Sequence, residues 1–296
     1  MRWRPLRLNT REQNKRFSKK PILILMGFLV FVFGARGFSQ TSVEQSPARI
    51  ASVNICIDQL LWELVPRERL VSISYLSADP KWSPIAEQVR GIALNHGAAE
   101  EIVPLKPNVI FVGEFDAPDA IALLEKLGNR VERLPVPREL NEINVQILQL
   151  AEKVGAREKA QQMTEKIDGQ VAQLRQVKAG ESAKTAFWYT ANGVVIGAGT
   201  LEHELMELAG LRNLAAERGM YGFNQLDLEF LLSARPQILI VERGSDAAYS
   251  LAQEYLSHPA LKNADFKIID LPTGLSGCAA SVIGDVAEKL NQELTR

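Results

Sequence analysis

The chain has 296 residues, of which 46% are hydrophobic and 23% are charged, a composition typical of a globular protein with one or two domains. The formal net charge of −1 conceals an asymmetry, because the first 40 residues hold nine basic residues and one acidic residue and the remainder is strongly acidic. This acidic body argues against a nucleic-acid partner, since phosphate binding requires basic patches.

The N-terminal segment, residues 1–40, has the layout of a secretory signal peptide. A basic stretch runs to Lys20, twelve apolar residues follow at 22–33, and small and polar residues come next. Twelve apolar residues are few for a membrane span. We therefore expect export across the inner membrane to the periplasm with a cleaved signal, the alternative being an uncleaved anchor. No clean A-x-A precedes Thr41, so the cleavage point stays open.

Two cysteines, Cys56 and Cys278, lie in the part expected to be exported. Two thiols in an oxidising compartment can pair, but these are far apart in sequence, so a disulfide and two separate buried thiols both remain open. A metal site built on them is not expected, because no C-x-x-C spacing is present.

The first half alternates apolar runs typical of strands with helical periodicity. Pro107 separates a short helix from the strand after it, and Gly128 ends another helix. Strands alternating with helices indicate an α/β fold with a parallel sheet covered on both faces. The expected elements are a strand at 49–53, a turn at 54–58, a helix at 59–65, a strand at 70–75, a short helix from Glu100, a strand at 109–112, a helix at 117–127 and a strand at 131–136.

A charged helix is expected over residues 156–179. Its apolar residues recur at spacings of three and four and form one stripe. Such a helix reaches roughly 36 Å, the width of a small domain. Because it lies between two similar halves, we interpret it as a spine joining two lobes; a coiled-coil or surface helix is the alternative.

The second half resumes the alternation. Strands are expected at 184–190 and 193–197 around an Ala-Asn-Gly turn. The further expected elements are a helix at 201–208, a short helix at 229–234, strands at 237–241 and 267–272, and a terminal helix at 279–294.

One unit is written twice, as EEIVPLKPNVIFVGE and EFLLSARPQILIVER. In both copies a glutamate lies seven residues before the proline: Glu100 before Pro107, and Glu229 before Pro236. This repeat predicts two similar α/β lobes, 48–154 and 181–296, connected by the helix at 155–180. Ligands bind outside the carboxyl ends of such strands, so we expect a cleft between the lobes.

Four motifs carry a family resemblance: RIASVNICIDQLLWEL, EEIVPLKPNVIFVG, GTLEHELMELAGLRNL and LEFLLSARPQILIV. Over about residues 48–296 the chain resembles ABC-transporter periplasmic substrate-binding proteins of the iron-siderophore and cobalamin type, the class with a long interlobe helix. The resemblance implies two Rossmann-like lobes with parallel sheets that change their relative angle little on binding. It also implies that one glutamate per lobe, here Glu100 and Glu229, docks onto arginines of the permease. The alternative for both acids is a charge at a helix start.

By this resemblance the chain is a monomeric receptor that delivers its ligand to an inner-membrane permease dimer and its ATPase, with no cofactor of its own. A ferric siderophore is the first expectation, and cobalamin, another corrinoid or haem is the alternative. Aromatic side chains after strands suit a large planar or chelated ligand. The expected ligand-binding residues are Asn54, Tyr75, Trp82, Glu114, Phe115, Trp188, Tyr189, Tyr221 and Arg243. Further wall candidates are Ile55, Asn192, Phe223 and Ser245, and candidate cations for an anionic chelate are Lys81, Arg218 and Arg243.

Two other function classes are disfavoured. A bare-metal site needs converging ligands, whereas His96, His203 and His258 lie in different segments. A periplasmic enzyme is less likely than a receptor, because G-x-S-x-G, G-x-x-x-x-G-K and H-E-x-x-H are all missing from the sequence. We therefore expect no catalytic residues and no protein metal site.

Overall fold

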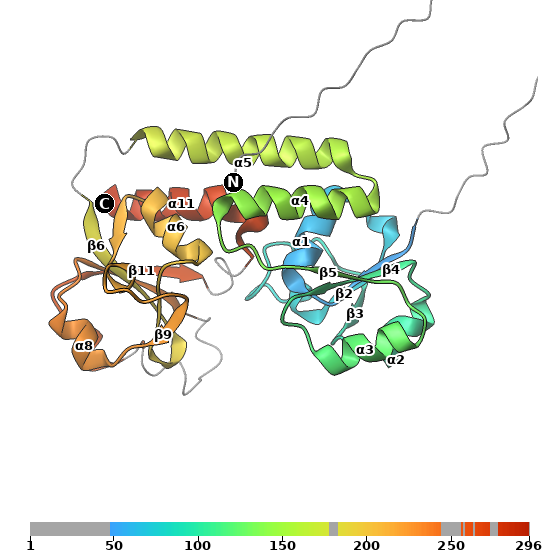
Figure 1. Ribbon diagram of the computed structural model, residues 1–296, viewed down its shortest axis with the longest axis horizontal. Coiled ribbons are helices and arrows are strands. Elements are labelled where there is room, and N and C mark those ends of the chain that lie inside the picture. The colour runs from blue at the N-terminus through green and yellow to red at the C-terminus, as the bar shows by residue number, and fades with distance from the viewer. Residues whose placement is uncertain are drawn as a thin grey trace, which may run out of the picture. The chain divides into compact units, whose positions relative to one another are not determined.

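The computed structural model describes residues 48–177, 183–243, 256, 258–262, 264–272 and 278–295. The chain from residue 45 onward forms one compact unit, in which two α/β lobes follow each other (Figure 1). Within the described segments, none of the helices combines the length and the apolar character that crossing a membrane requires.

The first lobe is built on a five-stranded sheet with the order β3-β2-β1-β4-β5. All four strand pairs are parallel, as the sequence predicts. The order reverses between β1 and β4, which makes their carboxyl ends the expected ligand position. The strands are β1 (Ile50–Ser52), β2 (Leu70–Ser74), β3 (Ala93–Asn95), β4 (Val109–Gly113) and β5 (Val131–Leu134).

Helices cover both faces of this sheet. In β4, Phe111 packs into the cluster that contains α1, whereas Ile110 and Val112 pack into a second cluster with α2 and α3. This alternation explains why β4 reads as a continuous apolar run, since a strand buried on both faces needs apolar side chains throughout. The helices are α1 (Ile55–Leu64), α2 (Ala99–Ile102) and α3 (Pro118–Lys126), and short 3-10 turns follow at η1 (Arg67–Arg69), η2 (Tyr75–Ala78) and η3 (Val103–Leu105).

The turn expected at 54–58 is wrong. Helix α1 begins at Ile55, because the side chain of Asn54 accepts hydrogen bonds from the main-chain N–H groups of Cys56 and Ile57. Asparagine is among the preferred N-cap residues, and capping satisfies donors that a helix start otherwise leaves free. The cap places Asn54 and Cys56 at the carboxyl end of β1.

The second lobe has a six-stranded sheet with the main order β11-β10-β6-β7-β9, and β8 pairs with β6. It is mixed rather than purely parallel: β7 runs antiparallel to both β6 and β9. The reason is the tight turn η4 (Ala191–Gly193), which folds β7 back on β6 as a hairpin. The strands are β6 (Lys184–Thr190), β7 (Val194–Ile196), β8 (Leu211–Asn213), β9 (Phe223–Gln225), β10 (Ile238–Arg243) and β11 (Lys267–Pro272). The helices are α6 (Leu201–Leu208), α7 (Leu214–Glu217), α8 (Leu228–Ser233), α10 (Pro259–Lys262) and α11 (Ala279–Thr295).

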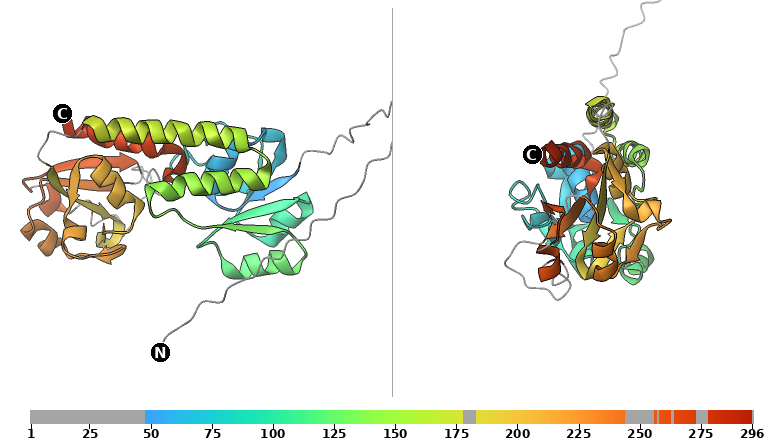
Figure 2. Two further views of the ribbon diagram at one scale, coloured as in Figure 1. Left: turned by 45° about the horizontal axis from the view of Figure 1, so that its top comes forward. Right: turned by 90° about the vertical axis from the view of Figure 1, so that its left-hand side faces the viewer.

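Three helices pack together along the two lobes, and α5 (Arg157–Val177) extends over both of them (Figure 1). It is the predicted spine, and α4 (Leu140–Val154) precedes it. Helix α4 was not among the predicted elements, although its buried face, which includes Ile143, Ile147 and Leu150, has helical spacing. Figures 1 and 2 show α4, α5 and α11 alongside one another, and the three pack pairwise. One hydrophobic core therefore continues through these helices from lobe to lobe.

A disulfide joins Cys56 to Cys278 across 222 residues of sequence. Cys56 lies in the first turn of α1, and Cys278 directly precedes α11. The covalent bond therefore fixes the start of the C-terminal helix to the first lobe. Of the two alternatives that the sequence left open, the paired form is the one observed.

The written repeat forms the same local structure twice. Glu100 and Glu229 are each the second residue of a short helix, α2 and α8. Lys106 and Arg235 each adopt a left-handed backbone, with φ of 47° and 45°, directly before the repeat's proline. The parallel strands β4 and β10 follow, beside β1 and β6. The two copies of the repeated sequence therefore also have the same local backbone structure.

Candidate functional site

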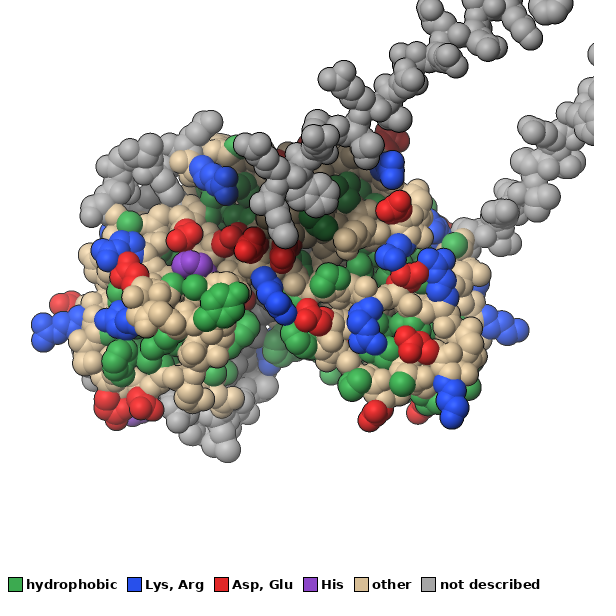
Figure 3. All heavy atoms as spheres, in the orientation of Figure 1, with side chains coloured by type: hydrophobic (Ala, Val, Ile, Leu, Met, Phe, Trp, Pro, Cys, Tyr) green, Lys and Arg blue, Asp and Glu red, His purple; other side chains and the backbone are tan. Residues whose placement is uncertain are grey.

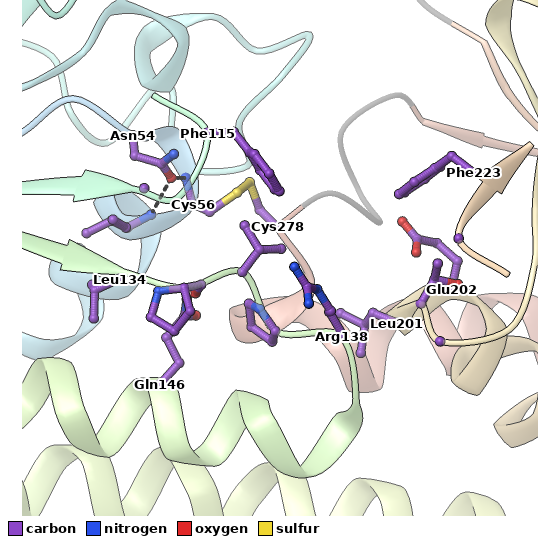
Figure 4. Close-up of a pocket in the computed structure, with 18 of the residues that line it drawn as sticks. Asn54, Cys56, Phe115, Leu134, Arg138, Gln146, Leu201, Glu202, Phe223 and Cys278 are labelled. Atoms are coloured by element: carbon purple, nitrogen blue, oxygen red, sulfur yellow. Dashed lines mark hydrogen bonds between the residues drawn. A yellow bond between two sulfur atoms is a disulfide. The ribbon is translucent and has the colours of Figure 1, made fainter. Parts of the chain in front are cut away.

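A cavity of about 560 Å³ is lined by residues of both lobes. In the space-filling view, hydrophobic side chains lie on both sides of a notch between the halves (Figure 3). The close-up shows the rings of Phe115 and Phe223 on opposite sides of the cavity and the disulfide in its wall (Figure 4). The lining residues are Asn54, Cys56, Ile57, Gly113, Phe115, Leu134, Pro135, Val136, Pro137, Arg138, Gln146, Gly199, Thr200, Leu201, Glu202, Tyr221, Gly222, Phe223 and Cys278.

The first lobe contributes the carboxyl ends of β1 and β4, where the strand order reverses. Asn54 follows β1 and donates a hydrogen bond from Nδ2 to Oδ1 of Asp116 at 3.1 Å. Asp116 in turn accepts from the main-chain N–H of Gly113 at 2.6 Å. These bonds fix the turn after β4, which leaves the ring of Phe115 77% exposed. A large apolar ring held in solvent at a cavity mouth is a natural ligand contact.

The loop after β5 forms a second wall of the first lobe. Gln146 on α4 donates from Nε2 to the carbonyl oxygen of Pro135 at 2.6 Å. The carboxylate of Glu114 accepts from the main-chain N–H of Val136 and from the guanidinium of Arg138, both at 3.2 Å. Glu114 does not line the cavity itself, but it holds two residues that do, Val136 and Arg138.

The second lobe contributes the turn between β7 and α6 and the segment before β9. Thr200 caps α6, because its hydroxyl accepts from the main-chain N–H of His203. Gly199 has φ of +72°, and the ring of Tyr221 lies directly against it: a Cβ there would come within 2.1 Å of Tyr221 Cζ. The glycine therefore seats Tyr221, whose side chain is 73% exposed, at the cavity.

We expect Gly199→Ala to displace the ring of Tyr221 and to weaken ligand binding. An added Cβ both overlaps the ring and strains a left-handed backbone, a cost on the order of 1 kcal/mol or more. Tyr221→Ala serves as the comparison, since both changes remove the same ring from its place. Ligand titration checks this, with Gly128→Ala as the control, because Gly128 also has positive φ but has open space around it. An affinity that falls equally in the control would contradict the seating role.

Glu202 is the acidic group of the cavity lining. Burial, helped by the nearby carboxyl of Glu242, raises the pKa of this carboxyl to about 7 against a lowering contribution from its own main-chain N–H. Glu242 on β10 accepts from the indole Nε1 of Trp188 at 2.9 Å. A carboxyl with this pKa is partly protonated near neutral pH, so it can donate as well as accept a hydrogen bond.

The structure brings together three of the nine expected ligand-binding residues at the cavity, namely Asn54, Phe115 and Tyr221. Phe223, a wall candidate, joins them. Glu114 acts through Arg138 rather than by lining the cavity. The expectation that these residues contact a ligand stays a prediction.

Other expected positions lie away from the cavity. Tyr75 stacks on His96, with ring centroids 4.4 Å apart, and Trp82 lies beneath Lys81. Arg218 lies over the rings of Phe187 and Phe230. Ile55 and Asn192 do not line the cavity either. The side chain of Arg243 and all of Ser245 fall outside the described residues.

The expectation that Trp188 or Tyr189 faces the cleft is wrong, since both side chains are fully buried. The physical reason is the position of β6, which pairs with β10, β7 and β8 in the middle of the sheet. A central strand is covered on both faces, so Trp188 packs into one core cluster and Tyr189 into the other. The end of β6 therefore belongs to the hydrophobic core and not to the wall of the cleft.

Three parts of the cavity wall were not predicted from the sequence, namely the disulfide, the loop 135–138 and Glu202. The loop contains two prolines, Pro135 and Pro137, after a strand, which is the composition of a fixed loop at a sheet's carboxyl edge. Glu202 comes two residues after the glycine-rich GAGT turn, in the first turn of α6. An acid shortly after a glycine-rich turn is the sequence feature that could have indicated Glu202 as a site residue.

Within the described segments, no group of three or more His, Cys, Asp or Glu side chains converges as a metal site would require. His203 lies 3.7 Å from Glu207, and His96 pairs with Glu101 at 2.9 Å.

Glu100 and Glu101 have different environments, although they are adjacent. The carboxylate of Glu101 accepts from the main-chain N–H groups of His96 and Ala98 and pairs with the His96 ring, which lowers the pKa of Glu101. Glu100 is exposed at the first turn of α2, as Glu229 is at the first turn of α8. Glu101 therefore stabilises the loop before α2, whereas Glu100 is exposed to solvent.

A family model described as periplasmic binding protein matches residues 50–266. Among solved structures, a periplasmic haem-binding protein of Vibrio cholerae superposes with a TM-score of 0.70 at 19% identity, covering 85% of this chain and 100% of the other. A periplasmic vitamin B12-binding protein of the same organism superposes with a TM-score of 0.63 at 22% identity, covering 84% and 97%. A periplasmic haem-binding protein of Pseudomonas aeruginosa gives 0.68 at 19% identity, covering 83% and 94%. No curated protein sequence matches the chain.

Proposed function

Because the chain belongs to the periplasmic binding protein family, whose members bind solutes, we propose that it is the substrate-binding component of an ABC importer for a metal-centred macrocycle, with a corrinoid as the first candidate. The observation that carries the ligand class is the cavity itself, whose lining is mostly apolar and holds aromatic rings from both lobes. Flat aromatic and aliphatic walls suit a broad, largely uncharged ring system.

A ferric siderophore, the first expectation from sequence, is supported less well by this cavity. Anionic chelates are bound by clustered cations. Among the lining residues the described cation is Arg138, and it already pairs with Glu114. Lys81 and Arg218, which the sequence suggested as further cations, lie against aromatic rings elsewhere. The siderophore therefore becomes one arm of the test.

Haem is the second candidate, and Tyr221 favours it. Its phenol is exposed and lines the cavity. A tyrosine oxygen is a known axial ligand of haem iron. Haem also carries two carboxylates, for which Arg138 is the available described partner. A corrinoid is rimmed mainly by neutral amides and matches a lining that holds an acid as well as a base.

Delivery requires a membrane partner, and the exposed acids Glu100 and Glu229 support the proposed docking. They occupy the same position of the repeated unit, one in each lobe, so a permease with two similar subunits can engage both. Residues 1–40 would act as the export signal that brings the receptor to the periplasm.

The test is a titration of the purified chain with cyanocobalamin, ferric haem and a panel of ferric siderophores, read by tryptophan fluorescence and by the ligand's absorbance. The indole of Trp188 donates a hydrogen bond to Glu242, whose carboxyl acts on that of Glu202 in the cavity lining, so ligand binding is expected to change its fluorescence. We expect one cyanocobalamin per chain, with affinity reduced about tenfold or more in Phe115→Ala/Phe223→Ala. Phe230→Ala is the matched control, an exposed ring outside the cavity. Binding of a siderophore alone would reject the macrocycle proposal, and binding of none would reject the receptor function.

A further inference from the structure

Among the described residues that line the cavity, Glu202 is the acid, and no other side chain forms a hydrogen bond with its carboxyl group. It starts α6 beside Leu201, and its carboxyl group faces the cavity near Phe223 (Figure 4). Among the described residues, the hydrogen-bond donor that acts on this carboxyl is its own main-chain N–H. A partly buried acid without a cationic partner is costly, which makes it an unusual choice for a merely structural position.

Apart from the exposed hydroxyl of Tyr221, the other polar side chains among the described lining residues already have partners. Asn54 caps α1 and binds Asp116, and Gln146 holds the carbonyl of Pro135. The hydroxyl of Thr200 donates to the carbonyl of Gly197 at 2.9 Å, and Arg138 binds Glu114. These contacts hold the side chains in place and shape the cavity. In the second lobe, Glu202 and the hydroxyl of Tyr221 are therefore the described polar groups available to a ligand, and Glu202 is the more buried of the two.

The chemistry around Glu202 selects a neutral partner. The carboxyl of Glu242 lies near enough to oppose a second negative charge at Glu202. The surrounding apolar lining stabilises the uncharged acid, which presents one donor and one acceptor side by side. A primary carboxamide presents the complementary acceptor and donor in the same plane, so the two groups form a paired hydrogen bond without burying a charge.

We infer that Glu202 is a specificity residue of this cleft and that its carboxyl group pairs with a primary carboxamide on the rim of the bound macrocycle. This inference rests on the proposed function, because it takes the ligand to be a corrinoid. It adds a discrimination that the apolar walls cannot supply: a rim carboxylate in the same place would meet an acid instead of a partner.

Binding should take up a proton above neutral pH. The ionised form of Glu202 must be reprotonated to make the paired bond, so affinity is greatest below about pH 7 and falls by up to tenfold per pH unit above it. Of the charged groups on neighbouring elements, Glu242 on β10 acts on this carboxyl, and Arg138 shares the cavity. Within the described residues of β8, α5 and α11, no charge contributes to the shift.

Charged groups on α6 itself are engaged elsewhere. Glu204 accepts from the main-chain N–H of Leu140 at 2.5 Å, and His203 lies between Glu207 and Asn213. Buried Asp58 also has a pKa raised to about 7, by desolvation first, but it binds the main-chain N–H of Ser74 and does not line the cavity. A pH effect from Asp58 would persist when Glu202 is replaced, which separates these two groups.

The experiment measures cyanocobalamin affinity from pH 5.5 to 8.5 for the wild type, Glu202→Gln, Glu202→Ala and the control Glu207→Gln, an exposed acid on the same helix. Glutamine keeps a donor and an acceptor at every pH, so Glu202→Gln should bind as the wild type does at pH 6 and lose the decline above pH 7. Glu202→Ala should bind about tenfold more weakly at pH 6. Glu207→Gln should reproduce the wild-type profile.

A second ligand tests recognition directly: cyanocobalamin derivatives in which one rim carboxamide is hydrolysed to a carboxylate. At pH 8 the wild type should reject one such derivative about tenfold or more, and Glu202→Gln should narrow this difference. Wild-type affinity that rises with pH, or a profile unchanged in Glu202→Gln, would overturn the inference. A wild type that binds haem but not cyanocobalamin also overturns it, while the importer function stands. A chain that binds neither overturns both.

Discussion

Removing the interlobe disulfide is expected to lower the unfolding temperature by about 10–20 °C. The bond between Cys56 and Cys278 closes a loop of 222 residues, and a cross-link over so long a loop restricts the unfolded chain by on the order of 5 kcal/mol. For a protein of this size each kcal/mol shifts the melting temperature by about 2–4 °C. The effect is large because the bond joins α1 of the first lobe to the start of α11.

The measurement is thermal unfolding by circular dichroism of the wild type, Cys56→Ser/Cys278→Ser and the wild type held in reductant. The double serine variant and the reduced wild type should agree, since both open the same loop. The same samples should bind ligand more weakly, because the disulfide lines the cavity. A melting temperature within about 2 °C of the wild type in both samples would show that the helix packing holds α11 in place without the bond.

Reversing both outward acids, in Glu100→Lys/Glu229→Lys, is expected to reduce uptake about tenfold or more while leaving ligand affinity unchanged. Each acid is exposed in the first turn of a short helix and lies outside the cavity lining. Charge complementarity at an interface orients the complex and accelerates encounter, and a reversed charge repels the partner. The double reversal should exceed either single one, because each lobe presents one acid.

Uptake and receptor-stimulated ATP hydrolysis are measured with the cognate transporter in vesicles, and ligand affinity on the same purified variants. Glu125→Lys and Glu165→Lys are matched controls, since both acids are exposed on helices outside the repeat. Raising the ionic strength should reproduce part of the single-variant loss, because salt screens exposed charges. Undiminished transport in the double variant would reduce Glu100 and Glu229 to helix-start charges.

The sequence by itself determined the two-lobed α/β architecture. Period-two and helical patterns are local properties, so the strands 184–190 and 267–272 and the helix 201–208 were placed with the bounds that the structure has. The repeat predicted two lobes because identical spacing around Pro107 and Pro236 imposes the same backbone, down to the left-handed residue before each proline. The helical spacing of Ile143, Ile147 and Leu150 also indicates helix α4, which was not predicted.

Only the tertiary structure decided which side chains form the cavity. Asn54, Phe115 and Tyr221 were predicted because each follows a strand or lies in a turn, yet the same reasoning placed Trp188 and Tyr189 there wrongly. Position along a strand does not reveal whether that strand is central and covered on both faces, since coverage depends on pairing between distant segments. The pairing of Cys56 with Cys278 and the burial of Glu202 depend in the same way on how α1, α6 and α11 pack. These contacts between segments remote in sequence create the chemistry of the site.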